Sequence, residues 1–404
     1  MKLKKRTLES TIRKALKTFP AVVVTGPRQS GKTTLLKMLN LKKHVFVSLE
    51  DPDARMRAQD DPRAFFAHNP PPIVIDEIQY CPELFSYIKT MIDKDRTAGQ
   101  WVLTGSQNFA LMHNVTQSLA GRAAIVSLLP FSFAELSGTG ASRGNKIVVP
   151  ADHKKHTPSH TIGSILLRGL YPEIATHKNV DRQLWCSSYI TTYLERDIRN
   201  ISNIGDLSQF ERFVRLCAAM TGHILNISSL ARDIGISVPT AKRWLSLLET
   251  GYQVYLLYPY YKNIGKRIVK SPKLYFIDPG VCSYLLGFHN EETIQKGASF
   301  GALFETFIVS EFLKRFMHAG EKPSMYYLRS RDGLEIDLVI EREGMMHLFE
   351  IKSSMTITKK HASHLHSLMK SMPQKIASAH IISCDKERFS LSQGISQYPW
   401  YDFL

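Results

Sequence analysis

The stretch AVVVTGPRQSGKTTLLKML (residues 21–39) decides the fold of the first part of the chain. It begins with an apolar run of strand length and ends with a helical pattern. Between them, Gly26 is followed by four residues and then by Gly31, Lys32 and Thr33, the spacing G-x-x-x-x-G-K-T. Glycines there let the backbone curl so that consecutive N–H groups face a phosphate, and the helix N-terminus adds a favourable dipole. The stretch therefore predicts a phosphate-binding loop.

The predicted ligands of this loop are ATP and Mg²⁺. Lys32 is expected to reach the β- and γ-phosphates, and Thr33 is expected to offer its hydroxyl to Mg²⁺. The alternative is a structural glycine turn. The residues predicted to bind ATP are Gly26, Pro27, Arg28, Gln29, Ser30, Gly31, Lys32, Thr33 and Thr34 in the loop, with Asp76 and Ser106 from later strands.

A second motif, IVIDE at residues 73–77, supplies carboxylates. A buried strand that ends in Asp76 places this carboxylate beside Mg²⁺, so that Asp76 and Thr33 would both bind the metal ion. Glu77 should point elsewhere because side chains alternate along a strand, and we predict that it polarises water toward the γ-phosphate. Hydrolysis is therefore favoured over simple nucleotide binding. The alternative for Glu77 alone is a cap on the following helix.

Two further positions are predicted to respond to the γ-phosphate. The strand WVLTGS (101–106) is expected to lie between the two motif strands, and its polar end offers Ser106 or Asn108 as a sensor. The alternative for Ser106 is an ordinary helix N-cap. Arg122, in LAGRAA, is a candidate arginine finger that acts catalytically across a subunit boundary. The alternative for this arginine is a structural ion pair.

The alternation of strand and helix patterns predicts an α/β fold with a parallel sheet covered on both faces. The 404-residue chain carries 52 Lys and Arg against 36 Asp and Glu, a formal charge of +16. This excess indicates a polyanionic partner, nucleic acid first and an acidic membrane surface second. The alternative is a basic surface that binds no such partner. No apolar run is long enough to span a bilayer, and the five cysteines lie far apart without a CxxC pair. We therefore expect a cytoplasmic protein with no membrane partner and no disulfide framework.

The motifs together resemble the prokaryotic AAA-type (AAA+) P-loop ATPases that carry a C-terminal domain of unknown function. The resemblance rests on GPRQSGKTT, IVIDEIQYCPELFSYIK, WVLTGSQN, SLAGR and LLPFSFAEL, and continues through YPE, YLERDI and KSPKLYFIDPGV. It implies an ATPase core at 1–136, then a winged helix and a PD-(D/E)XK nuclease-like domain at 286–404. Residues 137–161 are expected to be a flexible insertion, and residues 162–205 a helical lid or connector. We expect a homo-oligomer such as a hexameric ring.

The region 206–285 has the order of elements expected of a winged helix. The segments ISSLARDIGI and SVPTAKRWLSLLETG predict a helix, a turn at Gly235 and a second helix. A β-hairpin wing is predicted to follow over 252–278. The alternative is a winged helix that binds protein. Basic residues of the second helix and the wing are expected to contact DNA phosphates, and they are Lys242, Arg243, Lys262, Lys266, Arg267, Lys270 and Lys273.

The stretch GLEIDLVIEREGMMHLFEIKSS (333–354) predicts a β-hairpin near the C-terminus. If the chain turns through Glu343-Gly344, alternation brings Asp337 directly opposite Glu350. Two opposed carboxylates repel each other unless a cation lies between them, and Mg²⁺ prefers oxygen ligands. The hairpin therefore predicts a second metal site.

A lysine and a third carboxylate complete this predicted site. The same register places Glu335 opposite Lys352, whose ammonium group would stabilise developing phosphate charge. The pattern resembles the D…E-x-K motif of PD-(D/E)XK nucleases, which makes Asp337, Glu350 and Lys352 the candidate catalytic residues. Glu305 lies on an apolar helix face, where a carboxylate needs a partner such as a metal ion. The alternatives are an edge strand made soluble by charges and a surface ion pair.

These predictions combine into one function, ATP-driven processing of DNA. Two alternatives stay open. The first is a branch-migration or clamp-type ATPase whose nuclease-like domain binds DNA without cutting it. The second is an ATP-switched regulator that binds a protein partner.

Overall fold

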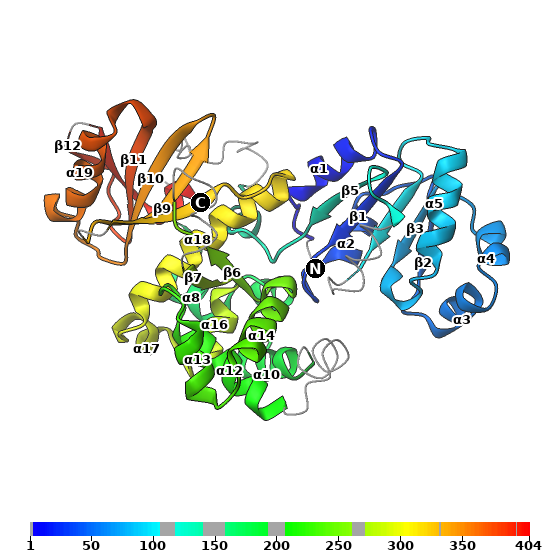
Figure 1. The fold of residues 1–404 in the computed structure, drawn as a ribbon, viewed down its shortest axis with the longest axis horizontal. Helices are drawn as coiled ribbons and strands as arrows, with labels where there is room; N and C mark the ends of the chain where they lie inside the picture. The colour runs from blue at the N-terminus through cyan, green and yellow to red at the C-terminus, as the bar shows by residue number, and fades with distance from the viewer. Residues whose placement is uncertain are drawn as a thin grey trace.

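The computed structural model shows three lobes (Figure 1). The N-terminal and C-terminal lobes are each built on a sheet, and the middle lobe is mostly helical. The long helix α18 (Phe300–Ala319) packs against elements of all three lobes. The structure describes residues 3–105, 118–139, 158–192, 207–260, 271–330, 333–392 and 394–404.

The N-terminal lobe contains a five-stranded parallel sheet in the order β2-β3-β4-β1-β5. Its strands are β1 (Ala21–Thr25), β2 (Val45–Ser48), β3 (Ile73–Asp76), β4 (Trp101–Thr104) and β5 (Ala123–Ser127). The three central strands are buried along their whole length, as expected of a parallel sheet with both faces covered. Because β4 lies between β3 and β1, the carboxyl ends of the motif strands adjoin, as the sequence predicts.

Alternate residues of β1 enter two different cores of this lobe. Val23 packs with α5 (Leu84–Lys94), whereas Val22 and Val24 pack with α1 (Leu8–Ala15) and α2 (Lys32–Met38). Helices therefore cover both faces of the sheet. The other helices of the lobe are α3 (Pro52–Asp60), α4 (Pro62–His68) and α7 (Phe133–Ser137).

The middle lobe packs helices around a small antiparallel pair, β6 (Val254–Leu257) and β7 (Lys273–Phe276). Gly235, in the left-handed conformation, separates α13 (Ile227–Ile234) from α14 (Val238–Thr250). The remaining helices among the described residues of this lobe are α8 (Ile162–Arg168), α9 (Pro172–Thr176), α10 (Arg182–Thr192), α12 (Leu207–Ala219), α16 (Pro279–Leu285) and α17 (Glu291–Lys296). Helix α8 packs against α16 and α17, so the described part of the segment expected to be a lid or connector, residues 162–192, lies within the middle lobe.

The C-terminal lobe contains a six-stranded mixed sheet in the order β12-β13-β11-β10-β9-β8. Glu343 and Gly344, with φ of 52° and 76°, turn the β9–β10 hairpin, and Met345 pairs with Arg342. The predicted hairpin register is therefore confirmed. The elements are β8 (Met325–Arg329), β9 (Glu335–Arg342), β10 (Met345–Lys352), α19 (Ser363–Ser371), β11 (Ile376–Ser383), β12 (Phe389–Ser392), β13 (Ile395–Pro399) and α20 (Trp400–Phe403).

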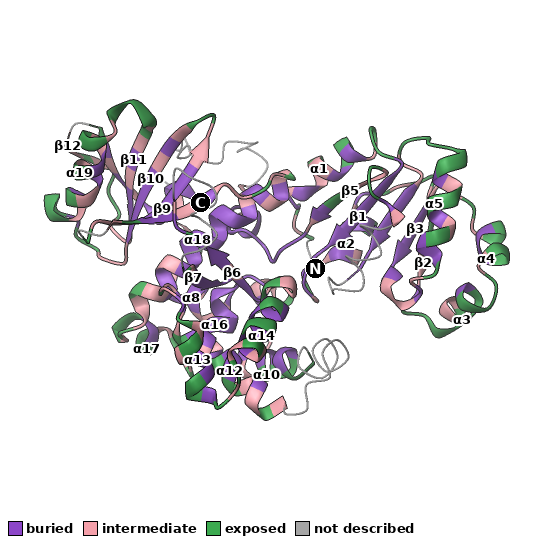
Figure 2. Cartoon of the chain, in the orientation of Figure 1, coloured by how far each residue is buried: buried purple, intermediate pink, exposed green. Residues whose placement is uncertain are grey.

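One apolar core runs through the middle and C-terminal lobes, with α18 buried at its centre (Figure 2). For example, the rings of Phe312 in α18 and Phe349 in β10 lie 4.9 Å apart. These two lobes are therefore joined by apolar packing as well as by the chain. Within the described ranges, no helix is both long enough and apolar enough to cross a membrane.

Candidate functional site

The loop between β1 and α2 has a shape that its two glycines make possible. Gly26 has a φ of 145°, and a Cβ atom on it would lie 2.2 Å from the carbonyl oxygen of Leu128. Gly31, with a φ of 92°, is the N-cap of α2 in the left-handed conformation, which other residues rarely adopt. Backbone geometry therefore requires both glycines of the predicted phosphate loop.

The Lys32 ammonium group lies inside the curl of this loop. Lys32 is 5% exposed, and its Nζ donates hydrogen bonds to the carbonyl oxygens of Gly26 at 3.1 Å and Pro27 at 3.0 Å. Ser30 is fully buried, and its hydroxyl has no hydrogen-bond partner in the part of the chain that the structure describes. A phosphate oxygen would satisfy this buried donor. Two predicted loop residues, Gln29 and Thr34, are exposed, and three more are half-buried, namely Arg28, Gly31 and Thr33.

Asp76 is held by hydroxyl groups from two neighbouring segments. It ends β3 and is 3% exposed. Thr33 Oγ1 donates a hydrogen bond to Asp76 Oδ2 at 2.9 Å, and the Thr104 hydroxyl at the end of β4 donates to Asp76 Oδ1. The structure thus brings the phosphate loop and the acidic strand end to one point. Thr33 and Asp76 fit a shared Mg²⁺ ion, because both offer it oxygen ligands.

Glu77 leaves the strand instead of continuing it. Its φ of 57° is left-handed, so a backbone turn, and not strand alternation, separates its side chain from that of Asp76. The Glu77 N–H group donates to Thr104 Oγ1 at 3.1 Å, and the side-chain amide of Gln79 donates to its carboxylate. Thr104 therefore contacts both acidic residues. Sequence reasoning missed this role because threonine is common in strands.

Of the residues predicted to respond to the γ-phosphate, the structure describes only Arg122. Ser106 and Asn108 fall outside the described residues. Arg122 precedes β5, so it lies at the amino ends of the parallel strands, whereas the phosphate loop lies at their carboxyl ends. Its Nε and Nη2 atoms lie 2.6 Å and 2.9 Å from the two carboxylate oxygens of Asp93. Arg122 thus makes a structural ion pair, which was the alternative to an arginine finger. It does not reach the nucleotide site of its own chain.

Tyr252 joins the strand that leads into the phosphate loop to the middle lobe, and sequence reasoning missed it. This residue follows α14 with a left-handed φ of 55°. Its hydroxyl lies 3.1 Å from Thr25 Oγ1 and 2.6 Å from Ser127 Oγ, and Thr25 directly precedes the loop. No local pattern marks this tyrosine, because both partners come from the N-terminal lobe.

The basic residues predicted to bind DNA have different surroundings. Lys242 and Arg243 are exposed on α14. Lys273 of β7 is 3% exposed and lies among carboxylates, so the prediction that it contacts DNA is wrong. Four further residues lie outside the described ranges, namely Lys262, Lys266, Arg267 and Lys270.

The carboxylates of the predicted C-terminal site come together around two lysines. Lys352 Nζ lies 3.2 Å from Asp337 Oδ2 and 3.0 Å from Glu350 Oε1. Asp337 Oδ2 also accepts a hydrogen bond from the Ile351 N–H group at 2.8 Å. Lys352 therefore takes the place between the opposed carboxylates that the sequence assigned to a metal ion.

The second lysine reaches the cluster from the middle lobe. Lys273 Nζ lies 3.3 Å from Glu305 Oε1 and 2.8 Å from Glu335 Oε1. The hydroxyl of Tyr275 donates to Glu305 Oε1 at 2.6 Å. The prediction placed Glu335 against Lys352, but the packing of β7 on α18 supplies Lys273 as its partner.

Two carboxyl groups of this cluster retain protons at unusually high pH. Burial, and then the charge of Asp337, raises the pKa of Glu350 to about 8. The same two causes raise the pKa of Glu305 to about 7 against the opposing effect of Lys273. Burial opposes the charge on Lys352, but Asp337 and Glu350 outweigh it and raise the pKa of that ammonium group. The cluster thus combines protonatable carboxyl groups with persistently charged lysines.

This cluster does not fit a metal ion as it is arranged. No three His, Cys, Asp or Glu side chains of the described residues are grouped so that they could hold one. The predicted ligands Glu305, Asp337 and Glu350 are not such a group, and a lysine ammonium group contacts each of them. The structure therefore does not support Mg²⁺ at these three residues.

Comparison with known proteins clarifies the N-terminal part of the chain. Residues 18–137 match the model of the AAA domain. This part is an AAA-type P-loop ATPase domain. Residues 160–292 match a domain of unknown function (DUF8612), and residues 300–403 match another (DUF4143).

Some proteins resemble most or all of the chain. Two uncharacterized proteins, of Mycobacterium bovis and Mycobacterium tuberculosis, are 29% identical to it over 404 residues, which cover 99% of this chain and 84% of theirs. The Walker-type ATPase of Pyrococcus abyssi is 17% identical, with a TM-score of 0.46 over 69% of this chain and 94% of its own. RuvB of Thermotoga maritima is 17% identical, with a TM-score of 0.29 over 61% of this chain and 88% of its own.

Proposed function

We propose that the AAA-type domain hydrolyses ATP at the loop that contains Lys32. The observation that carries this proposal is the 2.9 Å hydrogen bond between Thr33 and Asp76, which joins the phosphate loop to the acidic strand end. Lys32 would bind the phosphates, and Thr33 and Asp76 would hold Mg²⁺, which neutralises phosphate charge. Glu77 would accept a proton from the attacking water.

Two variants separate nucleotide binding from turnover. Lys32→Ala should abolish binding of a fluorescent ATP analogue, because the ammonium group inside the loop is lost. Glu77→Gln should bind the analogue normally and lose turnover by about 100-fold or more. The control is Glu83→Gln, an exposed glutamate nearby in the sequence. Turnover by Lys32→Ala, or normal turnover by Glu77→Gln, would contradict the assignment.

We propose further that this ATPase acts on DNA through the middle lobe. The left-handed turn at Gly235 between α13 and α14 has helix-turn-helix order, and the β6–β7 pair follows as a wing would. Helix α14 exposes Lys242 and Arg243, which suits phosphate contacts. The formal charge of +16 supports the same partner.

DNA binding is tested through its dependence on salt. The double variant Lys242→Ala and Arg243→Ala should reduce the slope of log affinity against log salt by about 2, because each lost phosphate contact removes about 0.9. Lys359→Ala with Lys360→Ala removes the same charge from another exposed segment and should leave the slope unchanged. If DNA neither binds nor stimulates ATP turnover, the alternative of a regulator that binds a protein partner is favoured.

Strand cleavage is a separate question, and we propose that the C-terminal lobe does not cut DNA. The support is Lys352, which lies between Asp337 and Glu350 where a nuclease would need a metal ion. Purified protein with Mg²⁺ should therefore turn over ATP and leave DNA strands intact. Metal-dependent cutting that disappears in Asp337→Ala would overturn this proposal and establish a nuclease.

We also propose that the chain forms a homo-oligomer such as a hexameric ring. The support is the position of Arg122 at the amino ends of the parallel strands, away from the loop at their carboxyl ends, where it could meet only the nucleotide of another copy. This role would require its ion pair with Asp93 to open. A monomer with full ATP turnover, measured by light scattering with nucleotide present, would contradict the proposal.

A further inference from the structure

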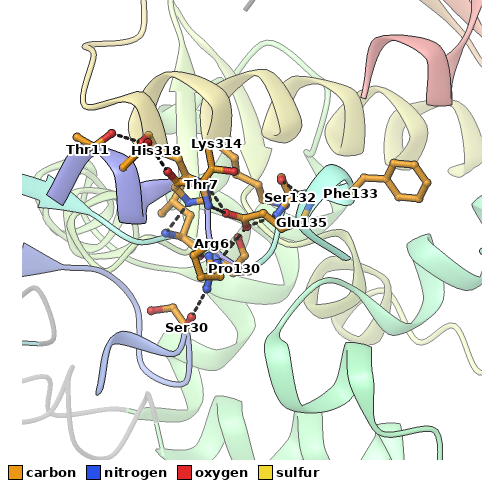
Figure 3. Close-up of polar contacts among 12 residues, drawn as sticks. Arg6, Thr7, Thr11, Ser30, Pro130, Ser132, Phe133, Glu135, Lys314 and His318 are labelled. Carbon is orange, nitrogen blue, oxygen red and sulfur yellow. Dashed lines mark hydrogen bonds and ion pairs between the residues drawn. The ribbon is translucent and has the colours of Figure 1, made fainter. Parts of the chain in front are cut away.

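Arg6 lies where the phosphate loop meets the rest of the molecule (Figure 3). This arginine is 4% exposed. Its guanidinium group donates hydrogen bonds to the Ser30 carbonyl oxygen at 2.8 Å, the Leu129 carbonyl oxygen at 2.6 Å and the Glu135 carboxylate at 3.1 Å. One rigid, planar group therefore ties the loop to two later segments of the chain.

Glu135 extends this connection to α18. Its buried carboxylate accepts hydrogen bonds from the N–H groups of Thr7 at 2.6 Å and Ser132 at 3.0 Å. His318 Nδ1, on α18, lies 3.4 Å from Glu135 Oε1, and His318 Nε2 accepts a hydrogen bond from the Leu129 N–H group at 3.2 Å. An Nε2 atom that accepts leaves the proton on Nδ1, facing Glu135. Both ring nitrogens thus fix α18 to the ATPase domain.

Helix α18 carries this attachment into the C-terminal lobe. Glu311 accepts hydrogen bonds from the Phe133 N–H group at 2.7 Å and from Lys314 Nζ at 2.8 Å. Glu305, about 20 Å from His318 along the helix, contacts Lys273 in the carboxylate–lysine cluster. A single buried helix therefore contacts the Arg6 network with one half and the cluster with the other.

We infer that Arg6 is a positioning residue that couples nucleotide binding at the phosphate loop to α18. A nucleotide that shifts Ser30 must either move Arg6 or break its bond to the loop. Arg6 in turn cannot move without disturbing Glu135, which is bonded to His318. The same path works in reverse, because energetic coupling between two sites is reciprocal. The inference rests on the proposed function, in that the loop must bind nucleotide.

Hydrogen–deuterium exchange of the full chain, with and without Mg²⁺ and ADP, tests this coupling. In the wild-type protein, nucleotide should slow exchange in the loop and change it in the half of α18 that contains His318. Arg6→Lys keeps a positive charge beside Glu135. The lysine has one side-chain nitrogen, however, in place of the three guanidinium nitrogens that donate hydrogen bonds. This variant should keep the loop response and lose the α18 response. Arg215→Lys, in an exposed pair with Glu211, is the matched control and should keep both.

The outcomes distinguish the coupling from the proposed function. An α18 response that survives in Arg6→Lys, or that is absent in the wild type while the loop responds, overturns the inference. No response of the wild-type loop would refute nucleotide binding itself. If Arg6→Lys fails to fold, the double variant Arg6→Met and Glu135→Met removes both buried charges, which is often tolerated. It should likewise keep the loop response and lose the α18 response.

Discussion

Replacement of Lys273 by methionine should destabilise the junction between the middle and C-terminal lobes. The lysine Nζ lies 2.8 Å from Glu335 and 3.3 Å from Glu305, in a side chain that is 4% exposed. Methionine keeps the apolar stem but leaves both carboxylates without this cation. Removal of one partner from a buried ion pair costs about 3–5 kcal/mol.

The surroundings of the two carboxylates place the expected cost at the lower end of that range. The Glu335 side chain is 30% exposed, so water can replace part of the lost interaction. Glu305 keeps its 2.6 Å hydrogen bond from Tyr275. We therefore expect a loss of about 3 kcal/mol, which corresponds to a fall in melting temperature of roughly 6–12 °C for a cooperative unit of 150–250 residues.

Differential scanning calorimetry of the full chain at mildly alkaline pH, where Glu305 is ionised, measures this shift. Lys296→Met is the matched control, because Lys296 pairs with Glu292 on the surface with 77% of its side chain exposed. Its removal should cost less than about 1 kcal/mol. In acid the deficit of Lys273→Met should shrink, since a protonated Glu305 needs no cation. A shift no larger than that of the control would refute the neutralising role of Lys273.

Other perturbations test the loop, its contact with the middle lobe and the protonation of the cluster. Gly26→Ala should abolish nucleotide binding, because the added Cβ atom would lie 2.2 Å from a backbone carbonyl oxygen; a wild-type Kd for an ATP analogue would disprove this. Tyr252→Phe should cost about 0.5–1.5 kcal/mol in chemical denaturation, since its two hydroxyl partners lie 3.1 Å apart and can bond to each other; a much larger loss would contradict that compensation. The pKa values of Glu305 and Glu350, about 7 and about 8 in the folded chain, exceed those of unfolded carboxyl groups. The folded state therefore binds more protons than the unfolded state, and the free energy of unfolding should fall as pH rises from about 5 to 8. The fall should be at most about 1.4 kcal/mol per pH unit for each group. A free energy of unfolding that rises over this window would contradict the assigned shifts.

Features that depend on neighbouring residues were predictable from the sequence. The spacing of Gly31 and Lys32 after Gly26 predicted the loop, because a curled backbone needs glycine at fixed positions. Alternation along two strands predicted that Met345 would pair with Arg342, because the turn between them leaves one register. Sequence periodicity carries such local information directly.

Features that depend on distant segments were missed or predicted wrongly. Lys273 belongs to a set of basic residues that is typical of a DNA-binding surface. Only the packing of β7 against α18 shows that it faces Glu305. Arg6 contacts the phosphate loop at Ser30, and Tyr252 contacts Thr25, the residue before the loop, but no motif surrounds either residue in the sequence. A single sequence does not state which segments meet in three dimensions, so these contacts required the structure.

The Mg²⁺ dependence of ATP-analogue binding, compared between the wild type and Asp76→Asn, tests the central claim most directly. Asparagine preserves the size of the side chain but removes the negative charge of the carboxylate. The Thr33 and Thr104 hydroxyls orient this carboxylate by hydrogen bonds. Mg²⁺ should strengthen binding to the wild-type protein and have little effect on the variant. If Asp76→Asn retains the full effect of Mg²⁺, the phosphate loop and the acidic strand end do not hold one magnesium–nucleotide complex.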